Sequence, residues 1–224
     1  MAELNGPRLE PQAGGPARQL VVFLHGYGAD GGDLIEIGRA WQQLLPDAAF
    51  VSPHAPQMLG AGMPGRQWFA LTMRDPEERW TGVNAAAPGL EQFLDAELAR
   101  RKLAPSALAL VGFSQGTMMA LHVGLRRAVA PAAIVGYSGM LVLSSTASPE
   151  NIAAEISARP PVLLVHGDRD DLIPAQALFH AAQALATFDV PVEWHMSLGI
   201  GHGIDAEGLR HGGEFLARRF KATP

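Results

Sequence analysis

One stretch decides the fold of this chain: Leu108-Ala109-Leu110-Val111-Gly112-Phe113-Ser114-Gln115-Gly116-Thr117. Its first four residues form a continuous apolar run, which predicts a strand that is covered on both faces. The segment from Thr117 to Ala128 is apolar and free of proline, which predicts a buried helix. Between strand and helix, Gly112 to Gly116 reads Gly-Phe-Ser-Gln-Gly, which matches the G-x-S-x-G pattern of a nucleophile elbow.

The turn at Ser114 needs unusual backbone angles, and glycines on both sides let the chain fold back closely. Such a turn lifts the serine hydroxyl above the sheet edge, and the amide of Gln115 then faces the same point and can donate to an oxyanion. The bare pattern is weak, because an ordinary glycine-rich turn also fits it. The predicted strand before it and helix after it are the context that favours a catalytic serine.

Composition places the chain among globular proteins. With 224 residues, 48% of them hydrophobic and 17% charged, it can bury a sizeable core. The formal net charge of -5 gives no basic patch for nucleic acid or an anionic membrane surface. The chain has no apolar run of about 18 residues, which argues against stable membrane insertion. The absence of cysteine excludes disulfides, thiolate metal sites and a cysteine nucleophile.

Strands and helices alternate along most of the chain. This order predicts a single α/β domain over residues 19–224, with a mostly parallel central sheet flanked by helices and no separate cap domain. Residues 1–18 are polar and rich in proline and glycine, which predicts a flexible N-terminal leader. They lack the features of a signal peptide, so we expect a cytoplasmic protein, although a processed precursor would look the same.

Two loops beside the elbow strand carry further signals. The predicted strand 20–24 ends in a glycine-rich turn at residues 25–32, which fits no phosphate-binding pattern. It is better interpreted as the source of a second oxyanion amide, from Tyr27, or as a simple turn. Residues 52–84 form a long irregular excursion with many apolar side chains, before a helix predicted over 85–103. We interpret the excursion as a flap over an acyl-binding groove, with Trp68 as the first candidate for contact, or as residues that anchor the loop.

Three loops at the ends of predicted strands carry a nucleophile, an acid and a base. In chain order they offer Ser114, an acid within 168–171, and His202, which is the order of the α/β-hydrolase triad. Histidine can take the serine proton near neutral pH, and a carboxylate holds its ring in the right tautomer. His25 and His166 each precede a glycine at a strand end and are interpreted as bonding to loop backbone.

The other histidines give no partner signal: His54, His122, His180, His195 and His211. None of the eight lies in a zinc-type pattern such as H-E-x-x-H, which argues against metal catalysis. Asp168 is interpreted as a brace for its loop, and Asp171 as solvent-facing or as a helix cap.

Several segments together resemble the phospholipase/carboxylesterase group of α/β-hydrolases, which includes acyl-protein thioesterases. They are residues 23–28 (Phe-Leu-His-Gly-Tyr-Gly), 67–69 (Gln-Trp-Phe), 112–116 (Gly-Phe-Ser-Gln-Gly), 166–170 (His-Gly-Asp-Arg-Asp) and 201–203 (Gly-His-Gly). The resemblance implies a set of site residues: Ser114 as nucleophile, Asp170 as acid, His202 as base, oxyanion amides from Tyr27 and Gln115, and Trp68 near the acyl site. The family commonly has proline directly after the acid, where this chain has Asp171, so Asp171 stays an alternative to Asp170.

The resemblance also implies the class of reaction. Members cleave carboxylic esters, lysophospholipids or thioesters, need no cofactor, and are often small homodimers. We therefore expect a small-molecule acyl ester or lipid as substrate, and no nucleic acid. Two alternatives stay open: a related α/β-hydrolase acting on lactones or peptides, and a non-catalytic member that binds acyl chains.

Overall fold

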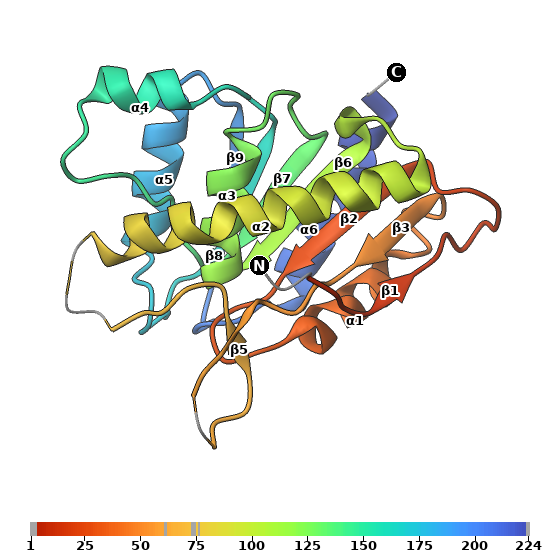
Figure 1. The fold of residues 1–224 in the computed structure, drawn as a ribbon, viewed down its shortest axis with the longest axis horizontal. Coiled ribbons are helices and arrows are strands. Elements are labelled where there is room, and N and C mark those ends of the chain that lie inside the picture. The colour runs from red at the N-terminus through yellow and green to blue at the C-terminus, as the bar shows by residue number, and fades with distance from the viewer. Residues whose placement is uncertain (1–3, 61, 73–74, 76, 223–224) are drawn as a thin grey trace.

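A parallel sheet forms the centre of the molecule. The computed structural model describes residues 4–60, 62–72, 75 and 77–222. Within them, seven strands form one sheet in the order β1-β3-β2-β6-β7-β8-β9 (Figure 1). Neighbouring strands are parallel except for β1, which runs antiparallel to β3. The strands are β1 (Arg8–Leu9), β2 (Gln19–Leu24), β3 (Ala48–Val51), β6 (Leu108–Phe113), β7 (Ala133–Tyr137), β8 (Val162–Gly167) and β9 (Val192–Ser197).

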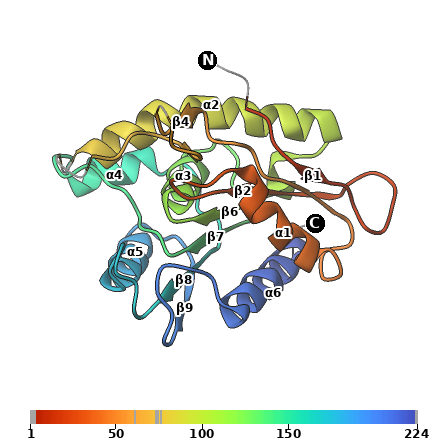
Figure 2. The ribbon, with the colours of Figure 1, turned by 90° about the horizontal axis from the view of Figure 1, so that it is seen from below.

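Helices cover both faces of this sheet, as Figure 2 shows for α2 and α3 on one side and α6 on the other. One core cluster joins the sheet to α2 (Glu78–Arg101), α3 (Gln115–Gly124), α4 (Pro149–Glu155) and α5 (Gln176–Thr187). The second joins the opposite face to α1 (Gly31–Trp41) and α6 (Ala206–Ala222). The central strands are apolar on both faces because both faces are buried. The predicted mostly parallel central sheet flanked by helices is therefore confirmed.

The chain changes direction within the sheet between β2 and β6. From β2 it goes to β3 on one side, and it later returns to β6 on the other side. Open α/β sheets place their sites at the carboxyl ends of the strands beside such a reversal. The loop after β2 and the elbow after β6 meet at that place.

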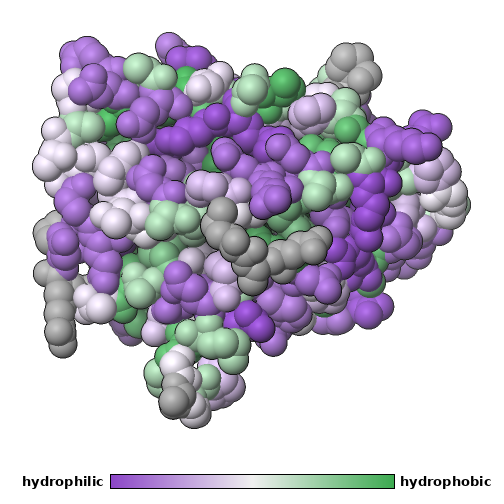
Figure 3. All heavy atoms as spheres, in the orientation of Figure 1, coloured by the Kyte–Doolittle hydropathy of each residue, from purple (hydrophilic) through white to green (hydrophobic). Residues whose placement is uncertain are grey.

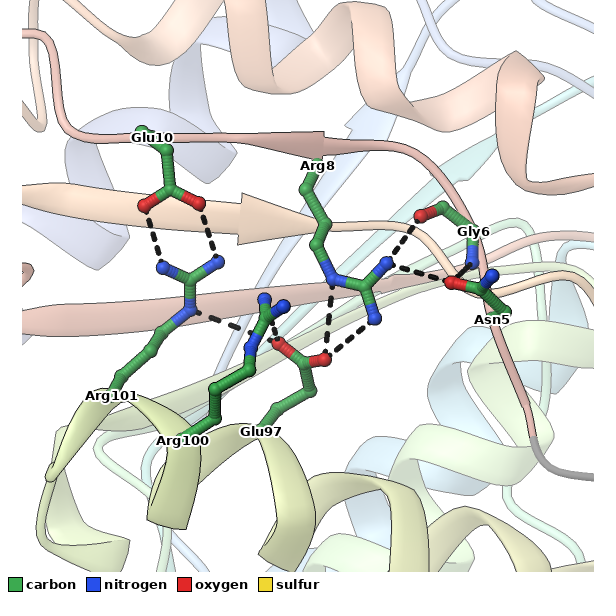
Figure 4. Close-up of polar contacts among 7 residues, drawn as sticks. All are labelled: Asn5, Gly6, Arg8, Glu10, Glu97, Arg100 and Arg101. Carbon is green, nitrogen blue, oxygen red and sulfur yellow. Dashed lines mark hydrogen bonds and ion pairs between the residues drawn. The ribbon is translucent and has the colours of Figure 1, made fainter.

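Part of the predicted leader belongs to the sheet. Arg8–Leu9 forms β1, paired with β3, and the Arg8 guanidinium lies 2.7 Å from the carboxylate of the buried Glu97 on α2. Figure 4 shows the network, in which Glu97 also contacts Arg100, and Glu10 bonds Arg101 at 2.7 Å. Because these partners lie about 90 residues away in the chain, local composition could not reveal the strand.

Helix α2 begins earlier than the sequence predicts, at Glu78 and not at residue 85. Gly82 falls within the irregular excursion that the sequence predicts over residues 52–84. In the structure Gly82 is packed against Phe69, and a Cβ at Gly82 would lie 2.2 Å from that ring. The missing side chain of Gly82 therefore allows the helix to lie close to the Phe69 ring. The predicted flap is correspondingly shorter, and in it β4 (Gln57–Met58) pairs antiparallel with β5 (Arg66–Gln67) to form a small hairpin.

The hairpin of residues 57–67 protrudes below the body of the molecule in Figure 1, and Figure 3 shows hydrophobic surface on it. Met58 is 58% exposed and Met63 is 55% exposed. Among the described residues, no helix combines the length and apolar character that crossing a membrane requires.

Candidate active site

The elbow holds Ser114 in a strained conformation, with φ 54° and ψ −116°. Backbone contact on both sides forces this turn. A Cβ at Gly112 would lie 2.4 Å from the carbonyl oxygen of Gly116, and one at Gly116 would lie 1.7 Å from the carbonyl oxygen of Leu24. Only glycine fits either position, and strain of this kind typically persists where the surrounding structure enforces it.

The loop after β2 runs beside the elbow. A Cβ at Gly26 would lie 3.3 Å from the Cβ of Ser114. Tyr27 is the next residue along the chain. Gln115 is the first residue of α3, where backbone N–H groups have no partner within the helix. Of the two residues predicted to supply oxyanion amides, Gln115 directly follows Ser114, and Tyr27 directly follows the glycine that contacts it. The side chain of Tyr27 itself is 46% exposed.

Asp170 is buried and contacts His202. Its Oδ2 accepts a hydrogen bond of 2.8 Å from Nδ1 of His202, and its Oδ1 accepts bonds of 2.9 Å from the amides of Leu172 and Ile173. Burial alone would raise the pKa of this carboxyl, but the Ile173 amide, His202 and the Leu172 amide together hold the pKa below its usual value. Asp170 is therefore ionised at neutral pH, so Nδ1 of His202 carries the hydrogen and Nε2 carries a free lone pair.

The neighbouring acids have other surroundings. Asp171, the alternative left open by the sequence, is exposed. Asp168 accepts a 2.6 Å hydrogen bond from the amide of Gly199 and so braces the loop that leads to His202. Between the two acids considered for the triad, the geometry favours Asp170.

His202 lies against the elbow. Its ring centroid is 5.0 Å from that of Phe113, the residue before Ser114. The next residue, Gly203, accepts a 3.1 Å hydrogen bond from the hydroxyl of Ser138, which is fully buried and has φ 45°. Sequence reasoning missed Ser138, although it directly follows β7 and so stands at the same sheet edge as the other three loops.

His25 and His166 bond to loop backbone, as predicted. Nε2 of His25 accepts from the amide of Ala55 at 2.9 Å, so Nδ1 carries the hydrogen and donates to the carbonyl of Gly26 at 2.8 Å. Burial lowers the pKa of His25, which keeps its ring neutral. Nε2 of His166 lies 2.8 Å from the carbonyl oxygen of Ile173 and 3.3 Å from Oδ2 of Asp170.

Trp68 is 1% exposed, and its indole N–H donates to the carbonyl of His25 at 3.0 Å. The side chain of Gln115 clamps the same segment, because it accepts from the Trp68 amide at 2.9 Å and donates to the Phe69 carbonyl at 2.8 Å. Trp68 also lines a cavity of about 240 Å³ that faces α2 near Leu90. Its indole thus packs against the loop after β2 and is held there by the hydrogen bond to His25.

A second cavity borders the elbow at Phe113, whose ring contacts His202. It measures about 220 Å³ and is lined by Phe113, Ile204, Leu34, Gly26 and three neighbouring residues of the loop after β2 and α1. Its wall is mostly apolar, as acyl and other small-molecule sites usually are. Sequence reasoning missed this cavity, because its lining comes from three distant segments.

Comparison with known proteins identifies the family of this chain. The family model described as phospholipase/carboxylesterase matches residues 10–219. An acyl-protein thioesterase 1 of Gibberella zeae is 27% identical over 213 residues, which are 89% of this chain and 89% of that protein. The esterase YpfH of Escherichia coli is 28% identical over 87% of this chain and 80% of its own length. The crystal structure of esterase PE8 is 41% identical, with a TM-score of 0.90 over 97% of this chain and 99% of that one. The chain belongs to the phospholipase/carboxylesterase family of α/β-hydrolases.

Proposed function

We propose that this protein is a serine hydrolase that cleaves small carboxylic esters or thioesters through Ser114, His202 and Asp170. The observation that carries the proposal is the 2.8 Å contact between Asp170 and His202, on a loop that packs against the strained elbow. Esterases and acyl-protein thioesterases among the relatives support the same class of substrate.

In the proposed reaction, Nε2 of His202 takes the proton of the Ser114 hydroxyl as its oxygen attacks the acyl carbonyl. The amides of Tyr27 and Gln115 donate to the oxyanion of the tetrahedral intermediate, each typically worth about 3 kcal/mol of barrier. Asp170 stabilises the imidazolium that forms. His202 then returns the proton to the leaving oxygen or sulfur, and water releases the acyl group by the same steps. These steps use only groups of this chain and water.

The cavity beside Phe113 and Ile204 suggests a preference among acyl groups. At about 220 Å³ it is smaller than the 300–1,000 Å³ of most drug-sized sites. We propose that it takes a short acyl or alcohol portion. The exposed methionines of the hairpin at residues 57–67 favour a second candidate, a long acyl chain that extends out of the cavity over that surface.

The test is hydrolysis of p-nitrophenyl esters of increasing acyl length and of a matched thioester series. Ser114→Ala is the blank, and its folding is checked by thermal melting. Cleavage that disappears in Ser114→Ala supports the serine mechanism, and full activity in that variant refutes it. A kcat/KM that falls beyond short acyl groups supports the short-chain proposal, whereas a rise with length supports the second candidate. Serine-dependent cleavage of lactones or peptides but not esters would favour the related hydrolases instead.

A further inference from the structure

The edge strand β9 presents a polar row to helix α6, where an apolar seam would be expected. Side chains alternate along a strand, so Glu193, His195 and Ser197 share one face. Glu193 pairs with two arginines of α6, at 2.9 and 2.6 Å, and Ser197 donates to Asp205 at 2.7 Å. The opposite face packs apolar groups, since Trp194 meets Phe179 of α5 with ring centroids 5.4 Å apart.

His195, in the middle of the row, differs from Glu193 and Ser197, which both have polar partners. Its Nε2 is buried and has no hydrogen-bond partner among the described residues. An unpaired buried polar atom is costly, so such an atom calls for an explanation. Its neighbours are metal-ligating groups: the ring of His211 lies 4.3 Å away between centroids, and Nε2 of His211 is 3.7 Å from a carboxylate oxygen of Glu207.

The three side chains converge from two elements. Glu207 and His211 are four residues apart on α6, so they lie on one face of the helix, opposite His195. One ligand atom from each of the three lies within 4.8 Å of the others. We propose that His195, Glu207 and His211 form a binding site for a divalent transition metal of the Zn²⁺ class, distinct from the site around Ser114.

The donor set selects the metal class. Imidazole nitrogens suit Zn²⁺, Co²⁺, Ni²⁺ and Cu²⁺, whereas Mg²⁺ and Ca²⁺ prefer oxygen-only sites. Three protein ligands and one water are a common tetrahedral Zn²⁺ set. Zn–ligand bonds of about 2.0–2.1 Å would separate the donor atoms by about 3.3 Å. Contraction from the present spacing needs only side-chain rotation, because the Glu207 side chain is 60% exposed and that of His211 33% exposed.

Arg210 competes for the same region. One terminal nitrogen of Arg210 lies 3.4 Å from Nε2 of His211 and 3.9 Å from a carboxylate oxygen of Glu207, and its other terminal nitrogen bonds Glu214 at 2.8 Å. Because Glu214 already pairs with the guanidinium, the metal can replace the weaker contacts to His211 and Glu207 while Arg210 stays paired. The positive charge nearby lowers the metal affinity, so we expect micromolar rather than nanomolar binding.

The position of the site gives it a structural role. His195 lies on β9 before the loop that carries His202, and Glu207 lies in the first turn of α6 after that loop. A metal bound between β9 and α6 would link both ends of this loop. Since only the folded chain brings the three ligands together, metal binding would stabilise the folded state.

The test uses the metal-free full chain and needs no substrate, so its outcome is independent of the proposed function. Co²⁺ titration should produce visible absorption bands at one equivalent, and Zn²⁺ at about 100 times its Kd should raise the Tm by about 5 °C or more. His195→Gln and His211→Gln should lose the bands and the Tm shift. The matched control is His180→Gln, on the exposed side of α5, which should keep both.

Glu207→Gln should disturb folding least of these variants, because the Glu207 side chain lies largely in solvent. This variant should weaken Co²⁺ binding at least about tenfold. Three outcomes would overturn the proposal. They are a wild-type chain that shows no Co²⁺ bands at millimolar metal, a Tm shift that persists in His211→Gln, and a shift that disappears equally in His180→Gln.

Discussion

Replacing Asp170 with asparagine tests the geometry of the candidate site most sharply. The two shapes are nearly identical, and the Asp170 side chain is fully buried, so little packing changes. Two backbone amides, each 2.9 Å from Oδ1, decide which way the new amide group points. The asparagine oxygen must face those N–H groups, because the reverse orientation would set its NH₂ against two donors.

The NH₂ group of the substituted side chain then faces Nδ1 of His202, where the carboxylate stood 2.8 Å away. A donor at that place forces His202 into the tautomer with hydrogen on Nε2. That nitrogen can no longer take the proton of Ser114. In serine hydrolases of unrelated fold, the wrong histidine tautomer lowers kcat about 10⁴-fold, which corresponds to about 5 kcal/mol of activation free energy. The folded state keeps both amide bonds and should lose no more than about 2 kcal/mol.

The assay compares kcat/KM for a short p-nitrophenyl ester in wild type, Asp170→Asn and Asp171→Asn, with urea unfolding of each. We expect a loss of about 10⁴ for Asp170→Asn with a folded protein, and a change of less than about threefold for the exposed Asp171→Asn. A folded Asp170→Asn enzyme that keeps a tenth of its activity would refute the tautomer argument. A larger loss in Asp171→Asn would assign the acid to the other position.

Two further predictions concern stability. Ser114→Gly should be more stable than Ser114→Ala by about 1 kcal/mol, because glycine relieves the strain at φ 54° and alanine keeps it; equal urea midpoints would show that the elbow stores no strain. Burial lowers the pKa of His122 to about 3, so below the unfolded pKa of about 6.5 the unfolded chain binds more protons. Unfolding free energy should therefore fall by up to about 1.4 kcal/mol per pH unit as pH drops from 6.5 toward 3, and His122→Leu should reduce this slope while the exposed His180→Leu leaves it unchanged. An unchanged slope in His122→Leu would mean that His122 becomes charged in the folded protein.

Sequence patterns predicted the central sheet because its strands are buried on both faces, as their unbroken apolar runs indicate. They predicted the loops of Ser114 and His202 because parallel strands bring their carboxyl ends to one edge. Choosing Asp170 over Asp171 needed the family resemblance, since two adjacent acids give the same local pattern. Only in the structure is it apparent that one of them is buried against His202.

The missed features depend on distant partners. Strand β1 has two residues and is held by Glu97, so no local periodicity marks it. The start of α2 was not predicted, because glycine is typical of loops, whereas Gly82 packs against Phe69 within the helix. His195 and His211 are 16 positions apart in a chain where neither stands in a recognised motif, and only the packing of α6 on β9 brings them together. Such pairings are properties of the tertiary fold.

The distances between the loops of the candidate site are set by contacts of the backbone rather than of side chains. The elbow touches the loop after β2 through Gly116, whose absent Cβ would lie 1.7 Å from the Leu24 carbonyl oxygen. The acid strand touches the His202 loop through Gly167, where a Cβ would lie 2.3 Å from the Gly201 carbonyl oxygen. Contacts of this kind leave no room for adjustment, so the three loops keep their separation whatever side chains face the substrate. Ile204, which lines the adjacent cavity, can therefore be replaced without moving the proposed nucleophile or acid, whereas Phe113 also packs against the ring of His202. Substrate range within this fold should then follow the cavity and the hairpin of β4 and β5, while the chemistry proposed for Ser114 stays constant.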